Sequence, residues 1–274
     1  MINQAKPLVY VILGAAGSGR REVLADLIEG GLTEGDRAAV LLSSGEMPCD
    51  HDARLGEVTR WTWTDGLIAA TFPEGGTHVF FVTDGRINPV DQIERLHTWI
   101  MAGGGEIGRV ITVVNCRLAE RHAALLAWYE ACIHFSDIAL LHQREGVANK
   151  WMSEFHLHFK KLCYPCLFEV VKAGRVKNPL VVLDPLARRM SHLFDIDEWT
   201  GLDLEGVEFG TEDEDGNAEE AEERAAKKKA KKGHPNESAE DDEDDWKPEV
   251  DPYLRHRIGG RREKEIPDIA KFLA

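Results

Sequence analysis

The residues with the clearest chemical pattern form a glycine-rich loop near the start of the sequence, Gly14-Ala-Ala-Gly17-Ser18-Gly19-Arg20-Arg21. Glycines at this spacing let the backbone curl, so that several amide N–H groups face one point and favour an anion such as phosphate. In the pattern G-x-x-x-x-G-K-[ST], the lysine reaches the terminal phosphates and the hydroxyl holds Mg²⁺. Here Arg20 stands at the lysine position and Arg21 at the hydroxyl position.

These two replacements have different chemical consequences. Arg20 keeps the positive charge and can still contact a phosphate, although a planar guanidinium does not replace an ammonium point charge. Arg21 cannot ligate Mg²⁺ and would repel it. We therefore expect a loop that binds nucleotide phosphate without Mg²⁺ and with weak or no hydrolysis. A glycine-rich turn that has no phosphate role is the alternative interpretation.

The elements around the loop predict how it is positioned. Leu8–Leu13 is a short apolar, β-branched run typical of a buried strand, and Arg20–Glu29 has the apolar spacing of a helix. Further strands are expected at 38–42, 79–82, 110–114, 138–141 and 167–171, and helices at 92–101, 119–132 and 149–162. Alternating strands and helices predict an α/β fold with a doubly wound, mostly parallel sheet, which binds ligands at the carboxyl ends of its strands.

Two stretches are less distinctive. Residues 61–64 and 67–72 predict a short extra strand and helix, and the run Asn178–Leu183 suggests a strand that leads into a short helix at 185–194. His156, His158, Cys163 and Cys166 lie close together in sequence and invite a zinc interpretation. Residues two apart on a helix point in different directions, however, so ordinary core or strand-edge side chains are the better prediction.

Composition divides the chain of 274 residues into three parts. We expect a nucleotide-binding domain of the P-loop type over 1–200, a disordered acidic linker over 201–245, and a C-terminal segment over 246–274 that docks on its own domain or binds a protein partner. The acidic stretch Thr211–Asp245 holds 15 acidic and 6 basic residues, a net charge of −9 out of −15 for the whole chain. Such a sequence cannot bury enough apolar surface to fold by itself.

The overall charge and the cysteines limit the classes of partner and compartment. A net charge of −15 argues against a nucleic-acid partner, because phosphate backbones are bound by basic surfaces. No stretch approaches the apolar length of a membrane span, which is about 20 residues. Five cysteines do not suggest a disulfide framework, and we expect a cytoplasmic protein.

The order of the motifs resembles the CobW-like GTPases, a cobalamin-biosynthesis and metallochaperone group related to HypB and UreG. The similarity covers about Leu8–Pro179. Val82-Thr83-Asp84-Gly85 is similar to the family's second site, with Val82 in place of a glutamate, and Val113-Val114-Asn115 is similar to its next strand end. His142-Gln143-Arg144-Glu145 stands where the family reads guanine with Asn-Lys-x-Asp.

The resemblance implies GTP or GDP as the bound nucleotide and a set of contact residues. With the loop itself, the nucleotide-binding residues that it implies are Gly14, Gly17, Ser18, Gly19, Arg20, Arg21, Asp84, Gly85 and Glu145. The family's metal loop corresponds to Ser43–His51, where Cys49 and His51 are the candidate ligands and an exposed polar loop is the alternative. No catalytic residue can be assigned.

Two hypotheses follow from these departures. In one, the chain binds nucleotide, and Asp84 pairs with Arg21 and so closes the former metal site. In the other, the chain is a pseudo-GTPase whose fold is retained as an interaction module, with the segment 246–274 as a second contact to a partner.

Overall fold

The computed structural model describes residues 6–195 and 251–273. Within them, eight strands form one sheet in the order β4-β3-β2-β5-β1-β6-β7-β8. The strands are β1 (Leu8–Leu13), β2 (Ala38–Ser43), β3 (Glu57–Thr64), β4 (Leu67–Ala69), β5 (His78–Val82), β6 (Glu106–Asn115), β7 (Ile138–His142) and β8 (Leu167–Val170). All neighbours pair in parallel except β3 and β4, which are antiparallel. The predicted α/β class and mostly parallel sheet are confirmed.

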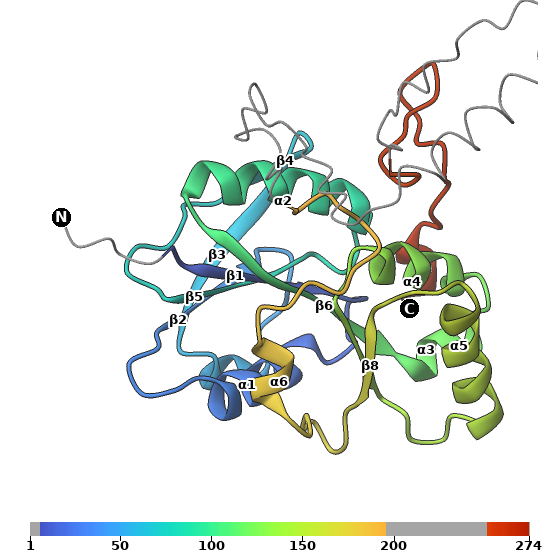
Figure 1. The fold of residues 1–274 in the computed structure, drawn as a ribbon, viewed down its shortest axis with the longest axis horizontal. Coiled ribbons are helices and arrows are strands. Elements are labelled where there is room, and N and C mark those ends of the chain that lie inside the picture. The colour runs from blue at the N-terminus through green and yellow to red at the C-terminus, as the bar shows by residue number, and fades with distance from the viewer. Residues whose placement is uncertain (1–5, 196–250, 274) are drawn as a thin grey trace, which may run out of the picture. The chain divides into compact units, whose positions relative to one another are not determined.

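Helices cover both faces of the sheet (Figure 1). They are α1 (Arg20–Gly31), α2 (Pro89–Gly103), α3 (Cys116–Arg121), α4 (Leu125–His134), α5 (Asn149–Lys161) and α6 (Pro179–Leu183), with 3-10 turns η1 (Asp50–Arg54) and η3 (Ile269–Phe272). Alternate residues of β1 enter two separate apolar clusters, one with Val9, Val11 and Leu13 and the other with Tyr10 and Ile12. Burial on both faces explains why this strand is apolar throughout.

Residues 178–183, for which a strand was predicted, form the helix α6 instead. Asn178 precedes Pro179, which begins the helix with a preset φ. Val182 and Leu183 are buried, whereas Leu180 and Val181 are more than half exposed, so the apolar run is amphipathic at helical spacing. Its contact with α1 is close, because a Cβ at Gly31 would lie 2.7 Å from Leu183 Cδ1.

Three other predicted elements differ. The helix expected at 185–194 is absent; the backbone there is irregular, and Met190 and Ser191 donate their amides to the carbonyl of His134. The helix expected at 119–132 is divided into α3 and α4, because His122 has an extended backbone with φ −129°. Residues 67–72 provide the short strand β4 and no helix.

The C-terminal residues 251–273 pack on the same unit that holds the sheet. Tyr253 and Ile269 are each 1% exposed and belong to the core cluster that includes Trp128 of α4. Asp251 lies 2.9 Å from the ring nitrogen Nε2 of His134, and Arg262 pairs with acidic residues of α2. These contacts are made in cis. The expected acidic linker, 201–245, and residues 246–250 lie outside the described residues.

Candidate phosphate-loop site

The glycine-rich loop lies between β1 and α1 at the carboxyl edge of the sheet. β1 is flanked by β5 and β6. Strands β2, β3 and β4 lie on the β5 side, and β7 and β8 lie on the β6 side, so β1 is at the point where the strand order changes direction. Open α/β sheets bind ligands at such a point. Gly14, Gly17 and Gly19 have φ values of 142°, 74° and 85°. These angles disfavour most side chains. At Gly14 and Gly19 a Cβ would also lie 2.5 Å from the carbonyl oxygen of Val113 and 2.4 Å from the ring of His142, so the loop requires glycine at these two positions, whereas the space around Gly17 is open.

Neighbouring strand ends hold the loop in place. The amide of Ala16 donates to the carbonyl of Gly85 at 3.0 Å. On the other side, His142 Nδ1 donates to the carbonyl of Ser18 at 2.8 Å, and Gln143 Nε2 donates to that of Gly17 at 2.7 Å. The loop is therefore preformed by side chains from the end of β7.

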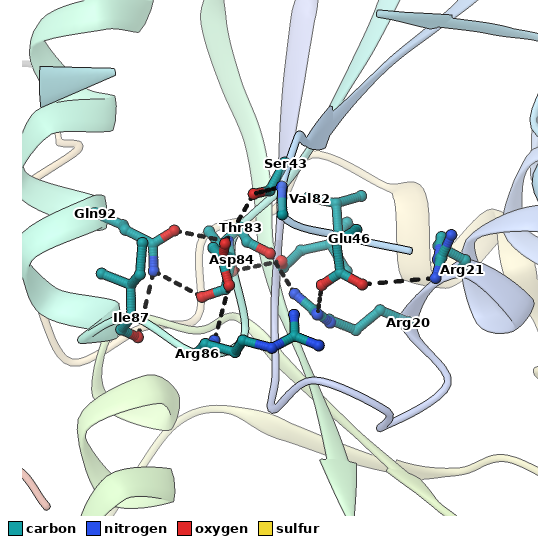
Figure 2. Close-up of polar contacts among 12 residues, drawn as sticks. Arg20, Arg21, Ser43, Glu46, Val82, Thr83, Asp84, Arg86, Ile87 and Gln92 are labelled. Carbon is teal, nitrogen blue, oxygen red and sulfur yellow. Dashed lines mark hydrogen bonds and ion pairs between the residues drawn. The ribbon is translucent and has the colours of Figure 1, made fainter. Parts of the chain in front are cut away.

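Arg20 and Arg21 are both paired with carboxylates from the segment that follows β2. Arg20 donates to Glu46 Oε1 and to the carbonyl of Thr83, while Arg21 lies 2.7 Å from Asp52 and 3.6 Å from Glu46 Oε2. Figure 2 shows Glu46 between the two guanidinium groups. The positive charge of the loop is thus compensated inside the protein.

Burial of this cluster affects its ionisation. The side chain of Arg20 is 3% exposed and that of Glu46 is 8% exposed. Burial lowers the pKa of Arg20 from its ordinary value, and the charge and hydrogen bond of Glu46 partly offset that effect. Removal of Glu46 would leave the buried guanidinium of Arg20 without its closest carboxylate, which destabilises a folded protein.

Asp84 does not pair with Arg21, contrary to the sequence hypothesis. Its Oδ2 accepts from Ser43 Oγ at 2.8 Å, and its Oδ1 accepts from the amide of Arg86 at 2.9 Å. The backbone of Asp84 is held by the side-chain amide of Gln92, which is fully buried (Figure 2). Asp84 therefore organises the segment after β5, and Glu46 and Asp52 provide the partners of Arg21.

A cavity of about 280 Å³ opens beside the loop. Its lining comes from the loop, the start of α1, the segment after β2 and the end of β7: Gly17, Gly19, Arg20, Arg21, Glu22, Glu46, Cys49, His51, Val82 and Gln143. Among the described residues, no hydrogen-bond acceptor meets the backbone amides of Gly17, Gly19, Arg20 or Arg21. Unpaired amides at a helix N-terminus favour an anion.

The residues at this site do not fit a Mg²⁺ ion of the usual P-loop kind. That ion needs the hydroxyl which follows the lysine, and a guanidinium stands there. Both oxygens of Asp84 already accept hydrogen bonds. Burial lowers the pKa of Arg20, and the nearby carboxylate of Asp84 offsets part of that effect, so Asp84 already faces a positive charge.

The residues expected to contact the base, His142 to Glu145, have separate roles in the structure. His142 and Gln143 hold the phosphate loop, as described above, so their side chains are engaged. Glu145 is 75% exposed and lies 3.9 Å from Arg117. It does not line the cavity, and its predicted contact with guanine stays a prediction.

The candidate metal ligands are likewise placed near the loop but not together. Cys49 donates to Asp52 at 3.4 Å, and both Cys49 and His51 line the cavity. Over residues 6–195 and 251–273, no group of three or more His, Cys, Asp or Glu side chains is arranged to hold a metal. Cys166 is buried and Cys163 is exposed, so this pair faces two environments.

Sequence reasoning missed the role of several site residues. Glu46, Asp52, Thr83 and Gln92 were not identified as partners of the loop or of its neighbour. One signal was present: two adjacent arginines that begin a helix beside a buried loop need carboxylate partners, and the segment after β2 supplies Glu46 and Asp52.

Comparisons with known proteins add only distant likenesses. No protein-family model matches the sequence, and no curated protein matches it.

Within the described residues, no helix has the length and apolar character needed to cross a bilayer.

Solved structures give weak matches. A Zn(II)-bound triple mutant of the YjiA GTPase is 16% identical, with 66% of this chain and 62% of that chain covered and a TM-score of 0.42. The Zn(II)-bound YjiA GTPase from E. coli is 15% identical over 67% of each chain, with a TM-score of 0.38. The cell division protein FtsY from Thermotoga maritima is 13% identical over 66% of this chain and 68% of its own, with a TM-score of 0.43.

The chain spans about 62% of the length of the first of these proteins. At these identities and scores, the likenesses carry no argument about activity.

Proposed function

We propose that the chain is a nucleotide-binding protein of the P-loop type whose loop holds phosphate through backbone amides, with weak or no hydrolysis. The observation that carries this proposal is the preformed loop, whose unpaired amides adjoin a cavity of about 280 Å³. Guanine nucleotides are the first candidates, because the motif order resembles the CobW-like GTPases.

Backbone amides can bind a phosphate without a lysine or a metal. They are fixed by the loop, so little reorganisation is needed when the anion arrives. The loop carbonyls bound by His142 and Gln143 support this rigidity. We therefore propose that binding is independent of Mg²⁺.

Efficient hydrolysis needs more than the loop. Phosphoryl transfer depends on positive groups that offset the charge developing on the transferred phosphate. Arg20 is committed to Glu46 and to the carbonyl of Thr83. Arg21 is committed to Asp52. These pairings support a site that binds better than it catalyses.

A second function, a pseudo-GTPase that serves as an interaction module, is favoured by one specific observation. Arg20 is 3% exposed and joins Glu46 to the end of β5, which is what a structural ion pair would do. In that case the fold is retained for a protein partner. Because residues 251–273 pack in cis, that partner would meet this segment on the domain.

A thermal-shift scan with GTP, GDP, ATP and ADP, each with Mg²⁺ or with EDTA, separates the two functions. A nucleotide at about 100 times its Kd stabilises a protein by roughly 2.7 kcal/mol. We expect one base to raise the melting temperature equally in Mg²⁺ and in EDTA. No shift with any nucleotide would favour the interaction module, and a shift that needs Mg²⁺ would contradict the proposed mode of binding.

A further inference from the structure

Glu46 occupies an unusual position for a residue beside a phosphate loop. Its side chain is 8% exposed, it pairs with Arg20 through Oε1, and its Oε2 lies 3.6 Å from Arg21. It also lines the same cavity as Gly17 and Gly19. One carboxylate therefore faces both arginines at the place where the loop would receive an anion.

Carboxylate and phosphate oxygens compete for the same donors. A guanidinium presents a planar set of N–H groups that matches either anion. Asp52 accepts from one guanidinium nitrogen of Arg21, Nη1, at 2.7 Å and 2.9 Å to its two oxygens. A ligand phosphate that reaches either arginine therefore competes with a carboxylate of the protein for the same positive charge.

The local charge adds to this competition. Three carboxylates lie in or beside the cavity, those of Glu22, Glu46 and Asp52. The arginine partners of the last two, Arg20, Arg21 and Arg60, are already paired within the protein, Arg60 at 3.8 Å from Asp52. In a partly buried site, unlike charges attract and like charges repel more strongly than in water. The carboxylates thus oppose a diphosphate that the amides would attract.

We propose that Glu46, assisted by Asp52, is an internal counter-ion that holds the affinity of the loop for phosphate low. The ligand class is a nucleoside diphosphate or pyrophosphate, and the inference rests on the proposed phosphate-binding function. Glu46 is in this sense a residue that sets affinity, and it acts through Arg20 and Arg21.

The test is calorimetric titration of the full chain with GDP and with inorganic pyrophosphate in EDTA. Glu46→Gln keeps the shape and removes the charge, and we expect it to tighten binding on the order of tenfold. The side chain of Asp52 is more exposed, at 21%, so Asp52→Asn should tighten binding less than Glu46→Gln does. Circular dichroism confirms that each variant is folded, and Asp52→Asn tests the inference if Glu46→Gln does not fold.

Glu29→Gln is the matched control. It makes the same acid-to-amide change at an exposed pair with Arg54 and away from the cavity, so affinity should not change. Equal GDP affinity in wild type and in both variants would overturn the inference and leave phosphate binding intact. Binding by no form of the protein would overturn both. Binding by Glu46→Gln alone would support the counter-ion role and place the wild-type affinity below detection.

Discussion

Arg20 stands where a phosphate loop normally carries lysine, and its environment explains why its removal should be costly. Its guanidinium is 3% exposed and is the closest partner of the buried carboxylate of Glu46. Arg20→Met leaves that carboxylate with only Arg21, at 3.6 Å. We expect a loss of about 3–5 kcal/mol in the free energy of unfolding, measured by urea denaturation.

Arg54→Met is the control for this substitution. Arg54 pairs with Glu29 at 2.7 Å, but the two side chains are 40% and 51% exposed. Exposed pairs contribute about 0–1 kcal/mol, so this variant should be nearly as stable as wild type. Similar losses of unfolding free energy in both variants would show that the buried Arg20–Glu46 pair contributes no more stability than an exposed pair.

Gly85 is a second residue-scale test, because it lies against the phosphate loop. A Cβ at this position would come within 2.2 Å of the amide nitrogen of Ala16 and 2.6 Å of the carbonyl carbon of Ala15. Gly85→Ala must therefore separate the two segments and lengthen the bond from Ala16 to Gly85, which is 3.0 Å.

We expect Gly85→Ala to lower the free energy of unfolding by about 2 kcal/mol or more and to weaken nucleotide binding, since the loop loses its support. Gly66→Ala is the comparison, because Gly66 has φ 73° and open space around it. It should cost only about 1 kcal/mol, the conformational part, in the same denaturation experiment. A Gly85→Ala protein as stable as Gly66→Ala would mean that the phosphate loop can move away from residue 85 with little loss of stability.

At the scale of elements, a partly buried pair joins the C-terminal segment to α4, beside the packing of Tyr253 on the ring of His134. Asp251 is 12% exposed and lies 2.9 Å from His134. Burial by itself would raise the pKa of Asp251, but hydrogen bonds from His134 and Ser191, with the charge of His134, outweigh burial and lower it. The carboxylate is therefore stabilised more in the folded state than in the unfolded chain.

The sign of the pH dependence follows from that lowered pKa. The contribution of Asp251 is present above its unfolded value of about 4, and it is lost as the pH falls through the lower folded value. Asp251→Asn should destabilise the protein by about 1–3 kcal/mol at pH 7, and the difference from wild type should begin to shrink as the pH falls below about 4.

Urea midpoints at pH 7, 5 and 3 measure this difference. Asp65→Asn makes the same change at an exposed turn, where Asp65 has φ 50°, a conformation that Asn also adopts. We expect an effect within about 0.5 kcal/mol at every pH. A difference between wild type and Asp251→Asn that stays constant down to pH 3 would contradict the role of ionised Asp251.

At the scale of the whole molecule, the part of the fold set by local pattern could be predicted. β1, the loop and α1 follow from an apolar run, glycines and helical spacing, and the parallel sheet follows from the alternation of elements. Both depend on residues that are close in sequence. The loop candidates Gly14, Gly17 and Gly19 could therefore be placed correctly at a strand end.

The rest depended on contacts between distant segments. The pairing of Arg20 with Glu46 and of Asp251 with His134 joins elements whose mutual position the sequence does not specify. The helix α6 was predicted as a strand, because a six-residue apolar run fits either structure until its packing on Gly31 is known. Tertiary packing decided each of these cases.

The most direct measurement of phosphate binding by the loop compares two variants of Gly17 by titration with GDP in EDTA. Gly17 has φ 74°, and no atom lies within 4 Å of the point that a Cβ would occupy, so Asp and Asn fit equally and both tolerate this conformation. They differ in one negative charge beside the amides. If the loop amides hold phosphate, Gly17→Asn should bind GDP close to wild type and Gly17→Asp should bind at least about tenfold more weakly. Equal affinity in the two variants would show that the phosphate does not lie at this loop and would contradict the proposed function.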